Sequence, residues 1–188
     1  MSLEIGVDEV GRGPWAGPLA AAAVALDPKC GLEGLKDSKL LGHQRRWELS
    51  LDIKQQAEAI GIGWAGVAEI DRLGLTKATR LAMLRALSGL DCSDAEIIVD
   101  GNFNYLKYRY RCQTVIKADC SVPAVSAASI IAKVARDHYM HQMAKLYPDY
   151  GFAEHVGYGT SAHQQCLKIR GPSDIHRRLF APVAVLSV

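Results

Sequence analysis

Two apolar segments joined by a glycine-rich loop open the sequence: LEIGVDEVGRGPWAGPLAAAAVAL, residues 3–26. The first segment, residues 3–7, predicts a strand that is followed at once by two acids, Asp8 and Glu9. The second segment, residues 19–26, predicts another strand, although alanine has a low strand propensity. Strand ends are where sites are built in open α/β sheets, so this stretch is the first place to look for chemistry.

The rest of the chain alternates between helix and strand patterns. Helices are predicted over residues 43–59, 71–88, 125–146 and 161–169, and strands over 60–68, 96–99 and 110–117. We expect Asp71 to cap the second of these helices, and Ser161 with Gln164 to form a capping box at the last. This order predicts an α/β protein with a mixed sheet flanked by helices. No linker rich in Pro or Gly divides the chain, so the C-terminal segment should pack on the same body.

The composition excludes several classes of protein. Hydrophobic residues make up 49% and charged residues 22% of the 188 residues, which is ordinary for one globular domain and excludes a disordered chain. The longest apolar run, residues 19–26, is too short to span a bilayer, and acids near the N-terminus do not fit a secretory signal. Five cysteines without a C-x-x-C pair indicate reduced thiols. We therefore expect a cytoplasmic protein without membrane contact.

The charge of the chain is unevenly distributed. The net charge is only +2, but residues 155–188 carry four Lys or Arg residues against one acid, Asp174, and also three of the six histidines. A basic tail on a near-neutral body can attract a polyanion. Solvated surface charge produces the same imbalance, so the charge pattern alone does not decide the function.

Four acids stand at or just after predicted strand ends: Asp8, Glu9, Asp100 and Asp119. If the strands are neighbours, the carboxylates converge at one edge of the sheet, and their repulsion would raise at least one pKa. A divalent cation removes that repulsion, and oxygen ligands suit Mg²⁺ or Mn²⁺ rather than zinc. Taken singly, each acid is also explained by turn chemistry. Adjacent strand residues point to opposite faces, so Asp8 and Glu9 share a site only where the strand twists, or where Glu9 acts in another way such as through its backbone carbonyl.

Three further features could bind a ligand. Glycine in the loop GRGP, residues 11–14, lets backbone N–H groups approach an anion or a nucleic-acid backbone, although a tight turn without a ligand explains the same pattern. Lys39, in the segment Asp-Ser-Lys, supplies a cation. Tyr158 lies between two glycines and could stack on a sugar or a base, or simply fill the core.

Taken together, these motifs resemble those of the ribonuclease HII family. The resemblance rests on GVDEVGRGPWAGP (residues 6–18), LKDSK (35–39), EID (69–71), VDG (99–101), IKADCSVPAVSAASIIAKVARD (116–137) and GPSDIHRR (171–178). The motifs occur in the family's order over nearly the whole chain. Two departures are small: Ala118 stands where glycine is frequent, and Asp174 where proline is frequent.

The resemblance implies a fold and an activity. The fold is an RNase H-like mixed β-sheet flanked by helices, with a C-terminal helical extension. Residues 1–147 would form the catalytic core, and residues 148–188 an extension packed on the same domain. The activity is metal-dependent endonucleolytic hydrolysis of the RNA strand of RNA–DNA hybrids. It includes cutting on the 5′ side of single ribonucleotides in duplex DNA, leaving 3′-hydroxyl and 5′-phosphate ends.

The resemblance also assigns roles to the candidate residues. The catalytic and metal-binding acids are Asp8, Glu9, Asp100 and Asp119, which would hold two Mg²⁺ or Mn²⁺ ions during catalysis. Gly11, Arg12 and Gly13 would contact the ribose 2′-hydroxyl, Tyr158 would lie at the RNA–DNA junction, and Lys39 would also bind substrate. The partners are RNA–DNA hybrids and DNA duplexes that contain ribonucleotides, and we expect the enzyme to act as a monomer.

Two other functions stay open from the sequence. A DNA nuclease or resolvase of RNase H-like fold would use a similar cluster of carboxylates but would need no sensor for the 2′-hydroxyl. A protein that binds hybrids without cutting them would show no turnover with Mg²⁺ or Mn²⁺. The presence of all four acids argues against the second function, and an all-DNA control duplex discriminates the first.

Overall fold

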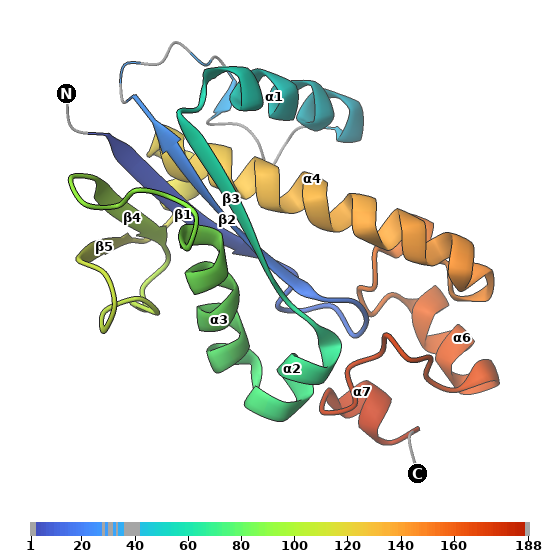
Figure 1. Cartoon of the computed structure of the whole chain (residues 1–188). Coiled ribbons are helices and arrows are strands. Elements are labelled where there is room, and N and C mark those ends of the chain that lie inside the picture. The colour runs from blue at the N-terminus through green and yellow to red at the C-terminus, as the bar shows by residue number, and fades with distance from the viewer. Residues whose placement is uncertain (1–2, 28, 30–31, 33, 36–41, 187–188) are drawn as a thin grey trace.

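The computed structural model describes residues 3–27, 29, 32, 34–35 and 42–186 of the 188-residue chain. Its centre is a five-stranded sheet in the order β3-β2-β1-β4-β5 (Figure 1). The strands are β1 (Glu4–Val10), β2 (Leu19–Leu26), β3 (Ala59–Ala65), β4 (Glu96–Asp100) and β5 (Cys112–Val115). β2 runs antiparallel to both of its neighbours, β3 and β1. The pairs β1–β4 and β4–β5 are parallel. The predicted mixed sheet is therefore confirmed.

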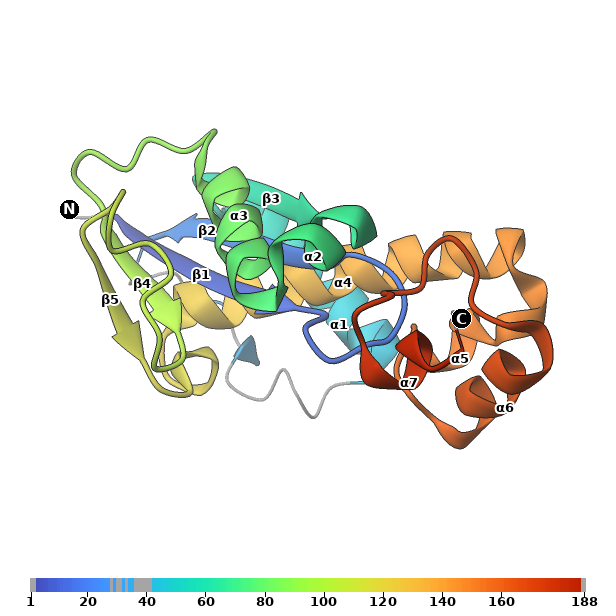
Figure 2. The ribbon, with the colours of Figure 1, turned by 90° about the horizontal axis from the view of Figure 1, so that it is seen from below.

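Helices cover both faces of this sheet (Figures 1 and 2). One face packs against α1 (His43–Gln56) and α4 (Pro123–Leu146), and the other against α2 (Val67–Leu73) and α3 (Leu75–Leu87). The short turns η2 (Ala118–Cys120) and η3 (Pro148–Tyr150) flank α4, and the chain ends with α5 (Phe152–His155), α6 (Ser161–Arg170) and α7 (Ala181–Ala184).

The central strands are poor in bulky residues because helices cover them on both sides. Odd-numbered residues of β2 pack in the core toward α3, and even-numbered residues from Ala22 to Leu26 pack in the core toward α1 and α4. The same crowding is extreme at Gly6 of β1, where an added Cβ would lie 2.0 Å from the carbonyl carbon of Ala124 in α4. Glycine and alanine thus let α4 approach the strand that carries Asp8 and Glu9.

Several predicted boundaries need correction. The helix predicted over 71–88 is two helices, α2 and α3, which meet at Gly74 with its positive φ of 76°. Asp71 lies inside α2 and caps nothing there; its carboxylate accepts the backbone N–H groups of Arg178 and Leu179 instead, at 2.9 and 3.1 Å. The N-cap of α6 is Thr160, whose Oγ1 accepts the N–H of His163.

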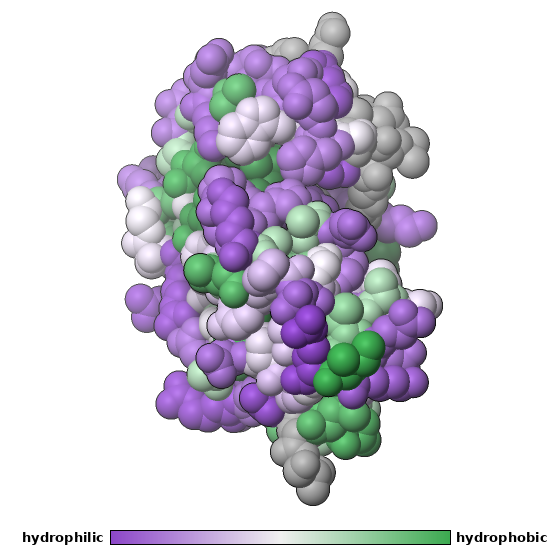
Figure 3. Space-filling model, turned by 90° about the vertical axis from the view of Figure 1, so that its right-hand side faces the viewer, coloured by the Kyte–Doolittle hydropathy of each residue, from purple (hydrophilic) through white to green (hydrophobic). Residues whose placement is uncertain are grey.

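The segment after α4 builds a third core beyond the end of the sheet, around Met140, Tyr150 and Phe152. Figure 3 shows this end of the molecule as largely hydrophilic, with a small hydrophobic area beside the C-terminus. None of the helices in the described part of the chain combines the length and the hydrophobicity needed to cross a bilayer.

Three histidines are buried in this third core, and two of them should make the fold sensitive to acid. Burial lowers the pKa of His163 and of His176 to about 4. The charge of His155 adds to the effect at His163, and the charges of His163, Arg178 and His155 add to it at His176. In the unfolded chain the same rings titrate near their ordinary value of 6.5. Below that pH the unfolded chain takes up protons that the folded chain refuses, so stability is complete above pH 6.5 and falls toward pH 4.

We therefore expect the free energy of unfolding to drop between pH 7 and pH 5 by about 1–2 kcal/mol for each of these histidines. Urea denaturation of the wild type and of His163→Asn at both pH values measures the drop, which the variant should reduce. The exposed His138→Asn is the matched control and should keep the wild-type dependence. An identical drop in all three proteins would remove the buried rings as its cause.

Candidate active site

The strand register places two of the acids side by side. The parallel pairing of β1 and β4 aligns Val7 with Val99, so the next residues lie on neighbouring strands: Asp100 ends β4, and Asp8 lies inside β1, which continues to Val10 beyond its predicted end. Adjacent strands in a sheet lie about 4.8 Å apart. Ile5 and Val7 face α3, so Asp8 faces the opposite side, toward α4. The predicted meeting of strand-end acids therefore follows from the order of the strands.

A tight turn after β5 brings in the third acid. Lys117 adopts a left-handed conformation with φ of 58°, and the turn η2 that follows carries Asp119. The backbone N–H of Ala118 donates to Oδ1 of Asp100 at 2.8 Å, which ties this turn to the end of β4. The hydroxyl of Ser126, in the first turn of α4, donates to the Asp119 carbonyl at 2.5 Å. Asp119 is thereby held between the sheet edge and α4.

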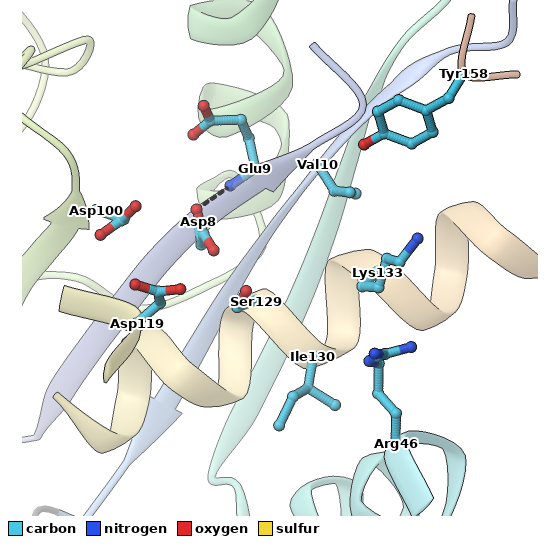
Figure 4. Close-up of a pocket in the computed structure, with 10 residues that line it drawn as sticks. All are labelled: Asp8, Glu9, Val10, Arg46, Asp100, Asp119, Ser129, Ile130, Lys133 and Tyr158. Atoms are coloured by element: carbon cyan, nitrogen blue, oxygen red, sulfur yellow. Dashed lines mark hydrogen bonds between the residues drawn. The ribbon is translucent and has the colours of Figure 1, made fainter. Parts of the chain in front are cut away.

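These acids line one pocket with a volume of about 380 Å³. Figure 4 shows the carboxylates at one end and two cationic side chains, from α1 and α4, at the other. The residues that line the pocket are Asp8, Glu9, Val10, Arg46, Asp100, Asp119, Ser129, Ile130, Lys133 and Tyr158. A pocket that places carboxylates opposite cations can hold a metal ion together with a phosphate group.

Burial and mutual repulsion make the pocket costly for negative charge. The pKa of Asp8 is raised well above its ordinary value, mainly by burial and then by the charge of Glu9, with a smaller contribution from Asp100. A hydrogen bond from the Ser129 hydroxyl opposes this rise. Burial also raises the pKa of Glu9, although the charge of Arg12 works against it. A bound cation would relieve both effects.

The donor set fits a hard divalent cation. Within the part of the chain that the structure describes, no three Asp, Glu, His or Cys side chains already form a metal-coordinating group, so the four carboxylates border the pocket at separate positions. Their oxygen atoms are the ligands that Mg²⁺ and Mn²⁺ prefer, and the raised pKa of Asp8 marks where positive charge is favoured. The residues present therefore fit such an ion.

Glu9 and Arg12 lie on a different side of β1 from Asp8. Figure 4 shows the Asp8 and Glu9 side chains leaving the strand in different directions. Glu9 is paired with Arg12, with 3.7 Å between Oε1 and the guanidinium. The Arg12 guanidinium also bonds to the hydroxyls of Thr79 and Tyr105. The side chain of Arg12 is therefore turned toward α3 and does not line the pocket.

Two buried arginines from the second half of the chain grip the loop over residues 11–18. Arg177 donates to the carbonyl oxygens of Gly11, Arg12 and Gly17, at 2.6 to 3.0 Å. Arg136 of α4 donates to the carbonyls of Ala16, Pro18 and Val156, at 3.0 to 3.1 Å. Burial, and then the charge of Arg136, lowers the pKa of Arg177 to about 9, which leaves it charged at neutral pH.

This grip sets the direction of the loop's N–H groups. Every described peptide bond is trans, and in a trans peptide the C=O of one residue and the N–H of the next point in opposite directions. Because the carbonyls of Gly11 and Arg12 point at Arg177, the N–H groups of Arg12 and Gly13 point away from it. Gly11, with φ of 91°, also has no room for a Cβ, which would meet Arg136 at 2.3 Å. The loop thus offers backbone donors on the face opposite the arginines.

Tyr158 lies where the loop and the pocket meet. Its ring lines the pocket, is 40% exposed, and lies 3.8 Å from the position that a Cβ of Gly13 would take. The guanidinium of Arg136 lies 5.9 Å from the ring centroid. The structure therefore brings Tyr158 and Gly13 together beside the acids. Lys39, the remaining candidate, is outside the described residues.

Sequence reasoning missed the three other polar residues of the pocket, Arg46, Ser129 and Lys133. Each comes from the face of a helix, and helix faces carry no local signature comparable to a strand that ends in acids. Lys133 forms an ion pair with Asp137 at 2.8 Å, which holds it along α4 at the mouth of the pocket. The only sequence signal for Ser129 and Lys133 is their place in the long motif at 116–137.

Comparisons with known proteins agree with this geometry. A family model described as ribonuclease HII matches residues 5–183. The ribonuclease HII of Bordetella pertussis is 51% identical over 178 residues, covering 95% of this chain and 88% of that protein. The ribonuclease HII of Nitrosospira multiformis is 48% identical over 181 residues, covering 96% and 90%. The crystal structure of ribonuclease H2 from Pyrococcus horikoshii superposes with a TM-score of 0.84 at 27% identity, covering 98% of this chain and 96% of that one. The match confirms the RNase H-like fold with a helical C-terminal part.

Proposed function

The chain belongs to the ribonuclease HII family, whose members are metal-dependent endoribonucleases acting on the RNA of RNA–DNA hybrids, and from this premise we propose its finer activity. It hydrolyses the RNA strand of hybrids and cuts on the 5′ side of single ribonucleotides in duplex DNA. The bond between phosphorus and the 3′-oxygen of the upstream nucleotide breaks. Water supplies the oxygen that stays on the phosphate, so the products end in a 3′-hydroxyl and a 5′-phosphate.

In this proposal the four acids hold two Mg²⁺ or Mn²⁺ ions. Asp8, whose pKa the charges of Glu9 and Asp100 raise, would hold the ions together with Glu9, Asp100 and Asp119. When bound, two such ions activate water and stabilise the leaving oxygen in phosphodiester hydrolysis. The support from the chain itself is the buried, mutually repelling set of carboxylate oxygens, for which a cation is the natural partner.

Arg46 and Lys133 would hold the backbone of the cleaved strand. Both cations stand across the pocket from the carboxylates, where a phosphate beside the ions would lie between opposite charges (Figure 4). Binding through phosphate contacts carries no base specificity and weakens as salt rises. We propose a division between a catalytic core over residues 1–147 and an extension over 148–188, whose exposed basic side chains, Lys168, Arg170 and Arg178, add to the binding of phosphates.

Recognition of ribose would come from the glycine loop and the tyrosine. The N–H groups of Arg12 and Gly13 are turned away from Arg177 and can donate to a 2′-hydroxyl, the group that separates RNA from DNA. Tyr158 lies beside Gly13 and can stack on the sugar at the junction. In this account Gly11, Arg12 and Gly13 act through their backbones, while the Arg12 side chain braces the loop against α3.

The observation that carries the proposal is the single pocket in which four carboxylates face two cations beside the clamped loop. The test is a labelled DNA duplex with one internal ribonucleotide, incubated with Mg²⁺ or Mn²⁺. We expect one cut on the 5′ side of the ribonucleotide, abolished by EDTA, with mapped ends of the stated kind. Cutting of an all-DNA duplex would instead indicate a DNA nuclease, and binding of hybrids without any turnover would indicate a hybrid-binding protein.

Replacing Tyr158 by alanine should affect cleavage of the single-ribonucleotide duplex and of a long hybrid to different extents. Loss of the ring should lower kcat/KM on the single-ribonucleotide duplex by about tenfold, the scale of one lost stacking contact, because that substrate offers a single junction. Cleavage of a long hybrid, which presents many equivalent riboses, should change much less. Parallel kinetics on the two substrates measure the effect, and an equal loss on both would assign the ring a role in folding.

A further inference from the structure

A cluster of three buried histidines lies behind Tyr158, and the proposed chemistry leaves it unused. His155 ends α5, His163 lies in the first turn of α6, and His176 follows that helix. His163 and His176 are 0% and 1% exposed, and His155 is 8% exposed. The rings of His155 and His163 stack with 4.4 Å between their centroids. Buried imidazoles need a hydrogen-bond partner for each nitrogen, and here those partners fix their tautomers.

The hydrogen bonds form a series from Ser173 through His176 and His163 to Tyr158, and the groups at its two ends set the direction of every bond. The backbone N–H of Ser173 can only donate, so Nδ1 of His176, 2.9 Å away, accepts and carries no proton. The single proton of the neutral His176 ring is therefore on Nε2. That atom lies 2.9 Å from Nε2 of His163, to which it donates.

The other end of this series of hydrogen bonds, at Tyr158, agrees with this direction. Because Nε2 of His163 accepts, the proton of its neutral ring is on Nδ1. Nδ1 lies 2.9 Å from the carbonyl oxygen of Tyr158, a group that can only accept. A fixed donor at Ser173 and a fixed acceptor at Tyr158 thus allow one arrangement of protons. A charged His163 would bring two N–H groups face to face at the His163–His176 contact, and a charged His176 would do so at the N–H of Ser173, in accord with the lowered pKa of both.

The backbone next to the Tyr158 carbonyl is also held by His155. The N–H of Tyr158 donates to the carbonyl of His155 at 2.8 Å, and the N–H of Gly157 donates to Nδ1 of His155 at 3.2 Å. The residue before them, Val156, has φ of 43°, a left-handed conformation that is strained for a β-branched side chain. Such a loop keeps its shape only when its neighbours impose it. The N–H of Thr160 is a second donor to the Tyr158 carbonyl, at 2.9 Å.

We propose that His163 is a positioning residue for ribonucleotide recognition, which fixes the backbone of Tyr158 through the one-directional relay from Ser173 through His176. This inference rests on the proposed role of Tyr158 at the junction. The relay runs from the loop of residues 171–176 to the tyrosine, so the C-terminal extension sets the place of the ring against Gly13. His163 touches no substrate and acts through Tyr158 alone.

Two substitutions at His163 separate the relay from simple packing. His163→Asn can place its amide nitrogen where Nδ1 lies and keeps a donor for the Tyr158 carbonyl, whereas His163→Leu fills similar volume without any donor. We expect His163→Leu to lower kcat/KM on the single-ribonucleotide duplex by about tenfold, the scale of one buried hydrogen bond, and His163→Asn to restore most of that loss. Cleavage of a long hybrid should change little in either, and the exposed His138→Asn should match the wild type on both substrates.

A double-mutant cycle decides whether His163 acts through Tyr158. In the background of Tyr158→Ala, the further change His163→Leu should have no additional effect on the single-ribonucleotide duplex. Independent, multiplying losses would overturn the proposal, as would equal losses by His163→Leu on both substrates. If the wild type itself fails to cut the single-ribonucleotide duplex, the proposed function fails, and the relay is then judged by spectroscopy.

Nitrogen-15 NMR of the histidine rings gives that independent readout near neutral pH. The relay requires the proton on Nδ1 of His163 and on Nε2 of His176. In His163→Leu the N–H of Ser173 still holds the proton of His176 on Nε2, but that N–H loses its acceptor, so its resonance should shift. The opposite tautomers, or freely exchanging ones, would contradict the relay whatever the activity of the enzyme.

Discussion

Asp100→Asn should lose turnover by at least about 10³-fold in Mg²⁺ while keeping the affinity for an RNA–DNA hybrid within a few-fold of the wild type. Asparagine removes the charge that a divalent cation needs. It still offers an oxygen to the N–H of Ala118, now bonded to Oδ1 of Asp100 at 2.8 Å, so the turn that carries Asp119 should stay in place. The substitution should therefore slow the cleavage step and leave the folded structure intact.

The measurement pairs single-turnover cleavage in Mg²⁺ with hybrid binding in EDTA. Asp94→Asn, at an exposed acid, is the matched control for the loss of one negative charge and should keep full activity. Turnover of Asp100→Asn close to that of the wild type would remove Asp100 from the site. A parallel loss of binding and of helical content would assign its role to folding instead.

Arg177→Met should have the largest effect on stability. The change leaves the buried carbonyls of Gly11, Arg12 and Gly17 without their guanidinium donor. Each buried acceptor left without a donor costs about 1–3 kcal/mol, so the three carbonyls together are expected to cost about 3–5 kcal/mol of unfolding free energy. For a chain of this length, that corresponds to a fall in Tm of about 10 °C. The freed loop should also lose selectivity for ribose over deoxyribose.

Calorimetry or thermal circular dichroism checks the stability of this variant, and the exposed neighbour Arg178→Met is the matched control, expected near the wild-type Tm. If Arg177→Met instead melts like the control, the loop is held by other contacts, and the orientation of its N–H groups loses its explanation. Cleavage assays below the Tm of the variant then compare the single-ribonucleotide duplex with the long hybrid.

The sequence predicts the order of the helices and strands better than it predicts where a helix is interrupted. β2 has the predicted bounds, residues 19–26, because its apolar run is bordered by Pro18 and Asp27. The helix expected over 71–88 splits at Gly74, since a periodic apolar pattern continues across a glycine whose positive φ only tertiary structure reveals. Similarly, Asp is a residue type that often caps helices, but the hydrogen-bond donors to Asp71 lie more than a hundred positions away in the C-terminal segment.

Strand-end acids could be predicted to meet because their geometry depends on strand order alone. Asp8 and Asp100 need only parallel neighbouring strands in register, and the alternation of strand side chains already anticipates that Glu9 leaves β1 differently from Asp8. Arg46 and Lys133 depend on how α1 and α4 cross, and the grip of Arg177 on the glycine loop spans about 160 positions of sequence. No local pattern encodes contacts of that range.

The claim that the four carboxylates hold the catalytic ions is tested most directly by anomalous diffraction from a crystal grown with Mn²⁺ and a hybrid substrate. The account predicts manganese peaks within ligand distance of the Asp8 carboxylate, bordered by Asp100 and Asp119, with a phosphate between the ions and the cations of α1 and α4. Peaks held elsewhere, for example by the histidines around the small pocket between α1 and α4 that His43, His138 and His141 line, with none at Asp8, would contradict it.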